Sequence, residues 1–345
     1  MEEKVDILLT TYNTKIEYLK EQIDSILKQT YSNFNLLISD DCSNNDELKE
    51  ILKQYEKNDK RVKVYLQEKN LGYNKNFEFL LEKSTENYIM FADHDDVWYP
   101  EKIEKSLKKL KEKKVDLVYC NAHQIDENGN IINNNYFKYK NMPLIDGKGK
   151  LAISRYIGIG CSQTITKRVK EKMLPFKEEV IAHDWLAGFI ANSLNGIAYI
   201  EEPLFGYRLH NTNVFGGRSF SQNKKIWKEK NGTSYKSYLK YRNEKVIHKA
   251  YLDGVIMCEK YLDVLDIKDE DLNSKDAYSN SKNQENKEFL KDLIKYYENL
   301  LNSKYINFHI FKYFRFLSGK NLVKKMVKEI IIFHLPVVGY LVFKR

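Results

Sequence analysis

The feature that most constrains this chain is a regular alternation, over residues 1–120, of short β-type runs and amphipathic helical segments. Strands are predicted where apolar and β-branched residues form short runs: residues 5–10, 36–39, 62–66, 88–92 and 117–120. Between them, apolar residues recur three or four positions apart, as at Ile16, Leu19 and Ile23. Pro100 stands at the start of the fourth helical segment, where its missing N–H costs nothing. This alternation predicts an α/β domain with a largely parallel sheet.

The pattern changes after residue 120. The polar residues 127–130 predict a hairpin turn, and residues 133–150 predict a loop. A helix is expected from near His183 to Asn195-Gly196, followed by an edge strand that ends before Tyr207. We therefore predict one domain over residues 1–215. A basic helical module is predicted over residues 216–345.

The net charge of +9 is concentrated in this C-terminal module. Residues 304–345 hold nine Lys and Arg against one acid. The terminal apolar run of fourteen residues, interrupted by His334 and Pro336, is shorter than the roughly 20 residues that span a bilayer. With Lys324, Lys325 and Lys328 before it, this run favours peripheral attachment to an anionic membrane surface.

The aromatic and basic residues 224–249 allow three readings: a nucleic-acid surface, a lipid-docking surface, or a solvated helix pair with its tyrosines turned inward. We expect no nucleic-acid partner. The four cysteines form no CxxC pair, which fits a reducing compartment. The N-terminus has no signal-peptide pattern, so we expect a cytoplasmic protein, peripheral at the inner face of the plasma membrane.

Polar clusters follow four of the predicted strands. They are residues 10–13 (TTYN), 40–43 (DDCS), 70–73 (NLGY) and 93–96 (DHDD). In an open α/β sheet, ligands bind outside the carboxyl ends of the strands. Each cluster taken alone is equally a helix N-cap, because Asp, Ser and Asn are the usual capping residues. Four such clusters at one edge of a sheet favour a binding site.

The last of these clusters, Asp93-His94-Asp95-Asp96, places three carboxylates within four residues. These groups repel one another unless a cation is bound, and oxygen ligands suit Mg²⁺ or Mn²⁺. Such a cation takes its remaining ligands from water or from substrate phosphates, which predicts a diphosphate anchor. The alternative is a capped turn before the helix at Pro100.

Several common enzyme classes are disfavoured by missing motifs. The turn after the first strand has no G-x-G-x-x-G, so a dinucleotide oxidoreductase is not expected. The chain contains neither a P-loop nor a G-x-S-x-G nucleophile elbow.

An ordered set of motifs, TTYN, QTYSNFNLLISDDCS, NLGYNKNF, FADHDDVWYPEKI and HDW, resembles the family-2 glycosyltransferases. The resemblance covers about residues 4–215 and is closest to the rhamnosyltransferase-like branch of bacterial polysaccharide synthesis. It implies a nucleotide-diphospho-sugar transferase fold of the GT-A type, with a mixed sheet and helices on both faces. It also implies transfer with inversion at the anomeric carbon. Cys42 stands where the family usually has glycine.

The resemblance assigns nucleotide-sugar contacts to seven residues of the N-terminal half: Thr10, Tyr12, Asp41, Asn70, Lys75, Asp93 and Asp95. Asp41 would grip the nucleobase, and Lys75 would meet phosphate or base. Asp93 and Asp95 are also the predicted metal ligands. Asp96 is a close competitor, because the motif aligns in more than one way.

Three more residues follow from the same resemblance. Asp184 falls where the family places its general base, the carboxylate that takes the proton from the acceptor hydroxyl. Its alternative is an N-cap of the helix that starts there. Arg208 and His210 would contact the donor diphosphate, and their alternative is an ordinary surface arginine and a satisfied histidine.

The predicted reaction is metal-dependent transfer of a sugar from dTDP-rhamnose or a UDP-hexose to a saccharide or polyprenyl-linked acceptor. Capsule or O-antigen assembly in the cell envelope is the expected setting. The Q-x-x-R-W motif of processive synthases is absent, which favours the addition of one or a few sugars. Two alternatives remain open: a nucleotidyltransferase that releases pyrophosphate, and a non-enzymatic basic adaptor.

Overall fold

A computed structural model describes residues 3–140, 144–148, 157–177, 180–210 and 249–265, together with 288–292, 294–295 and 298. The chain divides into two compact units: Met1–Lys148 with Tyr156–His210, and Gly149–Arg155 with Asn211–Arg345. The predicted boundary at residue 215, the basic stretch up to residue 248 and the terminal apolar run lie outside the described residues. The domain limits therefore stay predictions.

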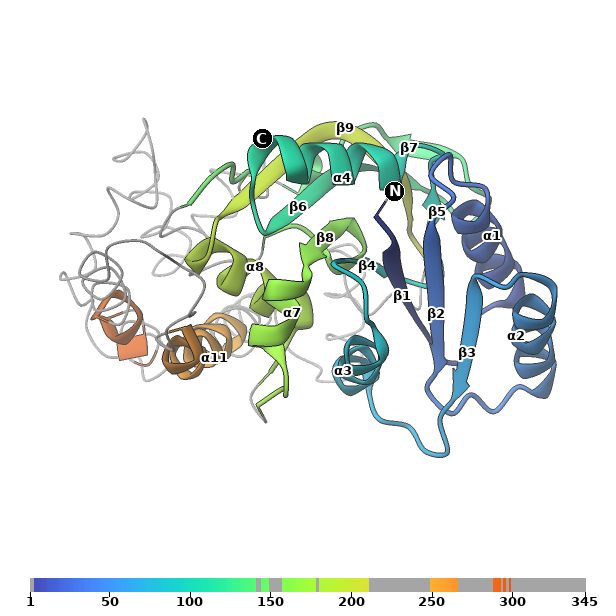
Figure 1. Cartoon of the computed structure of the whole chain (residues 1–345), viewed down its shortest axis with the longest axis horizontal. Helices are drawn as coiled ribbons and strands as arrows, with labels where there is room; N and C mark the ends of the chain where they lie inside the picture. The colour runs from blue at the N-terminus through green and yellow to red at the C-terminus, as the bar shows by residue number, and fades with distance from the viewer. Residues whose placement is uncertain are drawn as a thin grey trace, which may run out of the picture. The chain divides into compact units, whose positions relative to one another are not determined.

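The first half of unit 1 is a parallel sheet in the order β3-β2-β1-β4. Its strands are β1 (Val5–Thr11), β2 (Phe34–Asp40), β3 (Val62–Leu66) and β4 (Tyr88–Ala92). Its helices are α1 (Ile16–Leu27), α2 (Asp46–Asn58) and α3 (Tyr73–Lys83). In Figure 1, α1 and α2 lie on one side of β1–β3, and α3 lies on the other. All seven residues of β1 are buried, as expected for a central strand covered on both faces.

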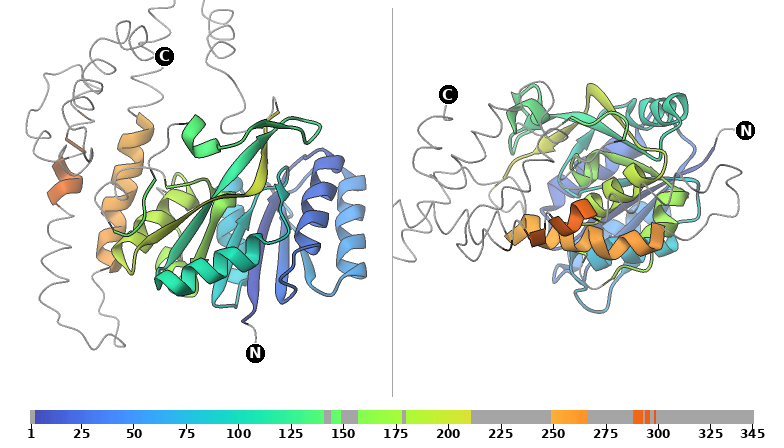
Figure 2. Two further views of the ribbon diagram at one scale, coloured as in Figure 1. Left: turned by 90° about the horizontal axis from the view of Figure 1, so that it is seen from above. Right: turned by 90° about the vertical axis from the view of Figure 1, so that its left-hand side faces the viewer.

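The second half of unit 1 extends this sheet and makes it mixed. Its elements are β5 (Val97–Trp98), α4 (Lys102–Lys113), β6 (Leu117–Ile125), β7 (Ile131–Asn133), α5 (Tyr136–Tyr139), the 3-10 turn η1 (Gly160–Ser162), β8 (Gln163–Thr166), α7 (Lys167–Met173), α8 (His183–Ser193) and β9 (Ile197–Arg208). The sheet continues from β4 through β8, β6 and β9 to β5, and β7 pairs with β6. β6 and β9 run side by side in parallel (Figure 2).

Three details differ from the expectations. A strand that was not predicted, β8, lies between β4 and the predicted fifth strand, now β6, and is antiparallel to both. The strand before Tyr207 was expected at the edge, but β9 lies between β6 and β5. The region expected to be a loop contains α5, with Asn135 as its N-cap.

In unit 2 the structure describes the helix α11 (Lys249–Leu265), whose buried residues include Val255, Met257 and Cys258. No helix within the described ranges is long and apolar enough to cross a membrane.

Candidate active site

The four polar clusters meet at one edge of unit 1. Because β1 to β4 are parallel, their carboxyl ends face the same way. The Asn13 N–H donates to Ser43 Oγ at 2.7 Å, which joins the first two clusters. The Asn70 side chain donates to the Asp41 carbonyl at 3.2 Å and brings in the third. Nδ1 of His94 lies 3.3 Å from the Thr10 carbonyl oxygen and brings in the fourth.

Asp41 shapes the loop before α3. Its two carboxylate oxygens accept the N–H groups of Leu71, at 2.6 Å, and Gly72, at 3.0 Å. Gly72 has a φ of +81°, which only glycine adopts easily. Cys42, where the family favours glycine, also has a positive φ of 63°. Of the other residues that were expected to contact the nucleotide-sugar, Thr10 is buried, whereas Tyr12 is 47% exposed.

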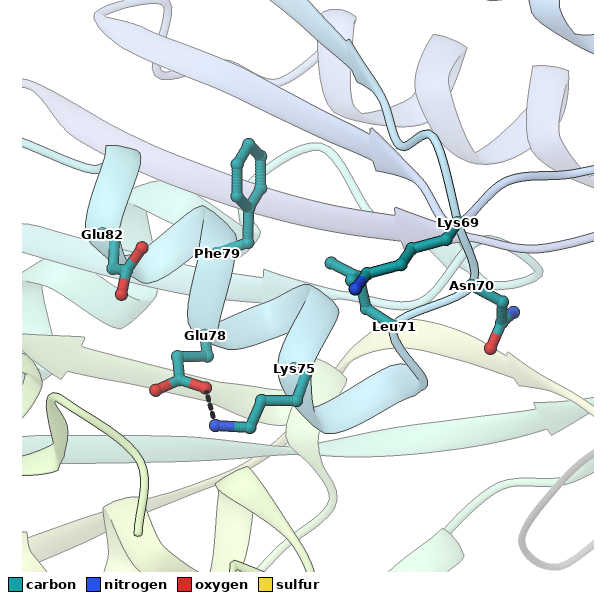
Figure 3. Close-up of a pocket in the computed structure, with 7 residues that line it drawn as sticks. All are labelled: Lys69, Asn70, Leu71, Lys75, Glu78, Phe79 and Glu82. Atoms are coloured by element: carbon teal, nitrogen blue, oxygen red, sulfur yellow. Dashed lines mark hydrogen bonds and ion pairs between the residues drawn. The ribbon is translucent and has the colours of Figure 1, made fainter. Parts of the chain in front are cut away.

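Asn70 and Lys75 reach a common cavity of about 380 Å³ beside α3 (Figure 3). The cavity is lined by Lys69, Asn70, Leu71, Lys75, Glu78, Phe79 and Glu82. Nζ of Lys75 lies 2.5 Å from Oε2 of Glu78, and the other oxygen of Glu78 accepts the Phe176 N–H. Lys75 is therefore held along α3 by its neighbour one helical turn away. Its contact with a nucleotide stays a prediction.

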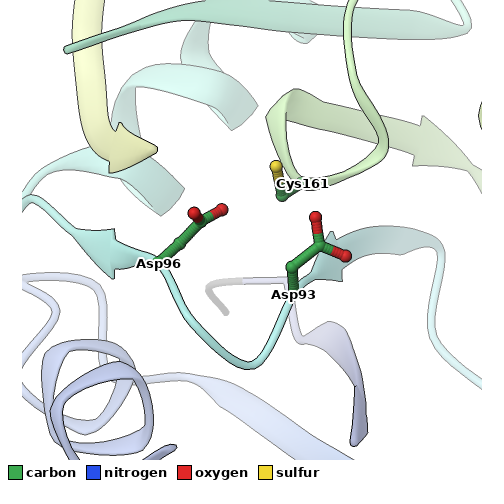
Figure 4. Close-up of side chains that lie close together, drawn as sticks. All are labelled: Asp93, Asp96 and Cys161. Atoms are coloured by element: carbon green, nitrogen blue, oxygen red, sulfur yellow. The ribbon is translucent and has the colours of Figure 1, made fainter. Parts of the chain in front are cut away.

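The three aspartates that follow β4 point in two directions. Oδ2 of Asp95 lies 2.7 Å from Nε2 of His210. Asp93 and Asp96 instead face Cys161, and the ligand atoms of these three residues lie within 4.8 Å of one another (Figure 4). Oδ1 of Asp96 accepts the Arg208 N–H at 3.1 Å. The structure thus groups Asp93 with Asp96 and places Asp95 against His210. The choice between Asp95 and Asp96 as the metal ligand beside Asp93 stays a prediction.

The charges of this acidic loop are strongly coupled. Burial and the charge of Asp95 raise the pKa of Asp93 to about 6. Burial and both neighbouring carboxyls hold the pKa of Asp96 well above its ordinary value. Burial acts in the same direction on Asp95, but the adjacent His94 and His210 outweigh it and lower its pKa. A divalent cation would relieve this repulsion, so the donor set fits the cation that was predicted here.

Arg208 ties the acidic loop to two other segments of unit 1. Its side chain is 1% exposed. Nε donates to the Asp95 carbonyl at 2.8 Å, Nη1 donates to the Glu127 carbonyl at 3.0 Å, and Nη2 pairs with Glu21. The alternative of an ordinary surface arginine is therefore wrong. All three guanidinium nitrogens have acceptors within the protein, so a contact to a diphosphate stays a prediction.

Lys102, at the start of α4, was not identified from the sequence. It is fully buried, its Nζ donates to the Cys161 carbonyl oxygen, and the Trp98 and Phe205 rings lie 3.7 and 4.4 Å away. Burial lowers its pKa. A lysine one position before an apolar helical stripe gives no sequence signal of such a place, because lysine is normally exposed. Lys102 fixes the backbone of Cys161 from the core side.

Asp184 lies in the first turn of α8 and is 7% exposed. The N-cap of that helix is Ala182, so Asp184 is not the capping residue, which was its alternative. Oδ1 accepts the Trp185 N–H at 2.8 Å. The Gly160 N–H also interacts with this carboxyl group. The carboxyl group is thus held by backbone donors from two segments, α8 and η1.

The charge of Asp93 reaches both Asp184 and Tyr73. Burial, and then the charge of Asp93, raise the pKa of Asp184 to about 7. Burial and the charges of Asp184 and Asp93 raise the pKa of Tyr73. The acidic loop and Asp184 therefore form one electrostatic unit, although they lie on opposite sides of β8 in the chain.

His183 fixes the start of α8. It is buried among aromatic rings, with Phe77 and Phe91 at centroid distances of 4.1 and 4.7 Å, and burial lowers its pKa to about 3. Oδ1 of Asn74, on α3, accepts the His183 N–H at 3.2 Å. A Cβ at Gly160 would lie 2.9 Å from Nε2 of His183, so only glycine fits there without displacing the ring. These contacts set the position of Asp184.

The site combines the Asp184 carboxyl group, whose pKa is about 7, with an acidic loop whose donor set fits a cation. A carboxyl group whose pKa lies near 7 is suited to taking a proton from a substrate at neutral pH. An acidic loop whose donor set fits a cation suits a phosphate-bearing substrate. Together they fit displacement of a phosphate leaving group by a hydroxyl.

The family model described as glycosyl transferase family 2 matches residues 6–174. An uncharacterized glycosyltransferase of Methanocaldococcus jannaschii is 31% identical over 237 residues, which cover 66% of this chain and 80% of that protein. The putative teichuronic acid biosynthesis glycosyltransferase TuaG of Bacillus subtilis is 27% identical over a match that covers 65% of this chain and 85% of TuaG.

A third relative is WfgD of Escherichia coli, a UDP-Glc:alpha-D-GlcNAc-diphosphoundecaprenol beta-1,3-glucosyltransferase. The two proteins are 26% identical over a match that covers 65% of this chain and 83% of WfgD. Among solved structures, residues 1–349 of S. aureus TarS in complex with UDP-GlcNAc align with a TM-score of 0.50 at 17% identity. The alignment covers 88% of this chain and 93% of that chain. At that identity the likeness supports the fold alone, a GT-A type sheet with its helices.

Proposed function

This chain belongs to glycosyl transferase family 2, and on that premise we propose that it transfers one sugar from a nucleoside-diphosphate sugar to a hydroxyl of a saccharide or lipid-linked acceptor, with inversion. The observation that supports this most is the placement of Asp184. Its buried carboxyl group, with a pKa near 7, is within the electrostatic reach of Asp93 in the acidic loop.

In the proposed reaction Asp184 acts as general base. Its carboxylate takes the proton from the acceptor hydroxyl as that oxygen bonds to the anomeric carbon. The bond from the anomeric carbon to the diphosphate breaks, and the nucleoside diphosphate leaves with the electron pair. A positioned base of this kind contributes roughly 10²–10⁴ in rate. The backbone N–H groups of Trp185 and Gly160 hold the carboxyl group in place.

The predicted cation, Mg²⁺ or Mn²⁺, would be held by Asp93 and Asp95. When bound, it would offset the charge that builds up on the departing diphosphate. His210 keeps the Asp95 carboxyl oriented through their 2.7 Å contact. Arg208 fixes the same loop through the Asp95 carbonyl at 2.8 Å.

The substrates are proposed at a coarser level. A dTDP-rhamnose or UDP-hexose donor fits the family resemblance. A UDP-hexose donor and a polyprenyl-linked acceptor also fit the name of one relative, which refers to UDP-Glc and a diphosphoundecaprenol-linked sugar, and the name of another refers to teichuronic acid. A role in cell-surface polysaccharide assembly follows from this acceptor. We also propose peripheral contact with the inner face of the plasma membrane through residues 321–345, on the basis of their lysines and apolar run.

The test is nucleotide release from a panel of donor sugars with Mg²⁺ or Mn²⁺. We expect one donor to be hydrolysed slowly without acceptor, and Asp95→Ala or a chelator to abolish the release. Asp184→Asn should still bind the donor in calorimetry but should lose transfer to an acceptor. Release of pyrophosphate would instead identify a nucleotidyltransferase. If no donor bound at all, the proposal would be wrong.

A further inference from the structure

Exposed apolar side chains gather in one segment of unit 1, the strand β7 and the helix α5 that follows it. Of the seven large apolar side chains that are exposed in the described part of the chain, four lie between residues 131 and 144. They are Ile131, Ile132, Tyr139 and Leu144, each more than half exposed. With the exposed Lys138 and Lys140, they are here called the hairpin surface. Single apolar side chains are ordinary on a protein surface, whereas a group of them marks an interaction site.

The buried side of this segment holds the hairpin surface outward. Phe137 is 1% exposed and packs on Tyr119 of β6, with ring centroids 5.6 Å apart. The Tyr119 hydroxyl accepts the Ile145 N–H at 2.7 Å. One side chain thus anchors both the helical turn that carries Tyr139 and the segment that carries Leu144. In Figure 2, α5 and the hairpin of β6 and β7 lie along the same edge of unit 1.

The charge of the hairpin surface is positive. Lys138 and Lys140 are its charged side chains, and residues 128–145 contain no Asp or Glu. Nζ of Lys140 lies 5.6 Å from the centroid of the Tyr139 ring. Apolar side chains, a tyrosine and flanking lysines are the groups that enter the headgroup region of an anionic bilayer. In a two-fold contact the same surface meets itself, so the lysines of two copies would repel one another. A lipid surface therefore fits better than a second copy.

The inner side of α5 faces the candidate active site. Tyr136 is 5% exposed and packs against Tyr207, with ring centroids 5.0 Å apart. Burial, and then the charges of Cys161, Asp96 and Asp184, raise the pKa of Tyr136, so its hydroxyl is within electrostatic reach of the proposed base. One helical turn thus connects the hairpin surface with the surroundings of Asp184.

We propose that the hairpin surface docks unit 1 on an anionic lipid bilayer. Its apolar side chains enter the headgroup region, and Lys138 and Lys140 meet lipid phosphates. One consequence rests on the proposed function. An acceptor anchored in the same bilayer would present its hydroxyl to Asp184 from the side on which α5 lies. This surface is separate from residues 321–345, for which a membrane contact was proposed from their sequence.

The direct experiment places a tryptophan in the hairpin surface. Tyr139→Trp, in the full chain, is mixed with vesicles of phosphatidylglycerol and phosphatidylcholine whose acyl chains carry bromine, which quenches indole fluorescence on contact. We expect the fluorescence added by this substitution to be quenched. Leu66→Trp is the matched control, at an exposed apolar position that ends β3, and its added fluorescence should not change. Unquenched fluorescence of Tyr139→Trp would overturn the proposal, whether or not the full chain binds the vesicles.

Vesicle flotation of the full chain measures how much the apolar side chains contribute. The apolar variant replaces all four with serine, and because each is more than half exposed, the core should remain intact. We expect its binding to the anionic vesicles to be about tenfold weaker than that of the wild type. Leu66→Ser should bind as the wild type does. Undiminished binding of the apolar variant would overturn the proposal.

The lysines need a control for net charge. Lys138→Gln combined with Lys140→Gln should weaken binding by about fivefold for each lysine. Lys53→Gln combined with Lys108→Gln removes the same charge from exposed positions on α2 and α4 and should have little effect. Equal weakening by the two pairs would assign the effect to net charge and contradict docking through the hairpin surface.

Two further measurements separate the remaining outcomes. If sedimentation without vesicles shows a dimer that the apolar variant cannot form, the surface joins two copies and the proposal is wrong. Nucleotide release without acceptor should be equal in the wild type and the apolar variant, whereas transfer to an acceptor embedded in vesicles should fall about tenfold in the variant. Quenching of Tyr139→Trp in a chain that releases no nucleotide would keep the docking surface and remove the proposed function.

Discussion

Oδ2 of Asp95 lies 2.7 Å from Nε2 of His210, across 115 positions of the chain. Both side chains are more than nine-tenths buried, and the His210 ring lies against Tyr18 with centroids 5.5 Å apart. This contact connects the loop after β4 to the end of β9. It makes His210 a support of the acidic loop from the far end of unit 1.

Removal of this support should weaken cation binding. His210→Ala leaves the Asp95 carboxyl without the group that orients it, and we expect the Mn²⁺ concentration for half-maximal nucleotide release to rise about 10–100-fold. His123→Ala is the matched control, because the hydrogen bond of the His123 ring is to Tyr99, whereas that of the His210 ring is to Asp95. Equal effects of the two substitutions would mean that His210 contributes only to packing.

Substitution of the proposed base should separate chemistry from binding. Asp184→Asn keeps an oxygen that accepts the Trp185 N–H, so the fold and donor affinity should survive, whereas transfer should fall by about 10²–10⁴. Asp116→Asn is the control. That buried carboxyl accepts Thr166 Oγ1 and the Asn195 N–H, each at 2.8 Å, and its loss should cost stability and spare turnover per folded molecule.

The rate of transfer should depend on pH through Asp184. Because burial raises the pKa of Asp184 to about 7, the reactive carboxylate is depleted below neutral pH. We expect the rate at saturating donor and cation to fall about tenfold per pH unit below this value. The residual rate of Asp184→Asn should lack this slope. An unchanged slope in that variant would assign the ionisation to another group.

The same carboxyl group should reduce the stability of the protein at high pH. Its pKa is raised from 3.8 to about 7 on folding, so the folded state disfavours the charged form. The penalty is absent below pH 4, grows between pH 4 and 7, and is complete above pH 7. Asp184→Asn should therefore be more stable than the wild type at pH 8, by about 2–4 kcal/mol, and nearly equal to it at pH 4. Denaturant melts at the two pH values measure this difference.

Arg208 should not tolerate lysine. Its guanidinium serves acceptors on three separate segments, the Asp95 and Glu127 carbonyls and the Glu21 carboxylate, and a lysine ammonium does not span them. We expect Arg208→Lys to cost about 2–4 kcal/mol of unfolding free energy. Arg61→Lys, at a partly exposed pair with Asp59, should cost about 1 kcal/mol or less. A small loss of unfolding free energy in Arg208→Lys would show that the loop is held by other contacts.

The sequence predicted the first half of the sheet well. β1 to β4 are signalled by local runs, and their parallel order places the clusters that begin at Thr10, Asp40, Asn70 and Asp93 at one edge. β8 was missed, because four residues, Gln163–Thr166, carry little local signal and gain their stability from β4 and β6 on either side.

The supports of the site could not be read from local patterns. The partners of Arg208 lie at Glu21, Asp95 and Glu127, as much as 187 positions away, and only the folded sheet brings them together. Cys161 has no motif spacing to Asp93 or Asp96 that would mark it as their neighbour. Lys102 is an exception to the usual exposure of lysine, and the fold alone reveals it.

The antiparallel strand β8 has an evolutionary consequence. Seven of the residues assigned to the nucleotide-sugar lie on β1 to β4, α3 and the loops between them, ahead of β5, whereas Arg208 and His210 lie at the end of β9. The segment with the proposed base follows β8, on the other side of that strand. Gene recombination between these stretches would exchange the segment with the proposed base and leave donor recognition intact where the incoming stretch restores the contacts of Arg208 and His210 to Asp95. Chimeras joined near α4 would then be a practical way to build new linkage specificities.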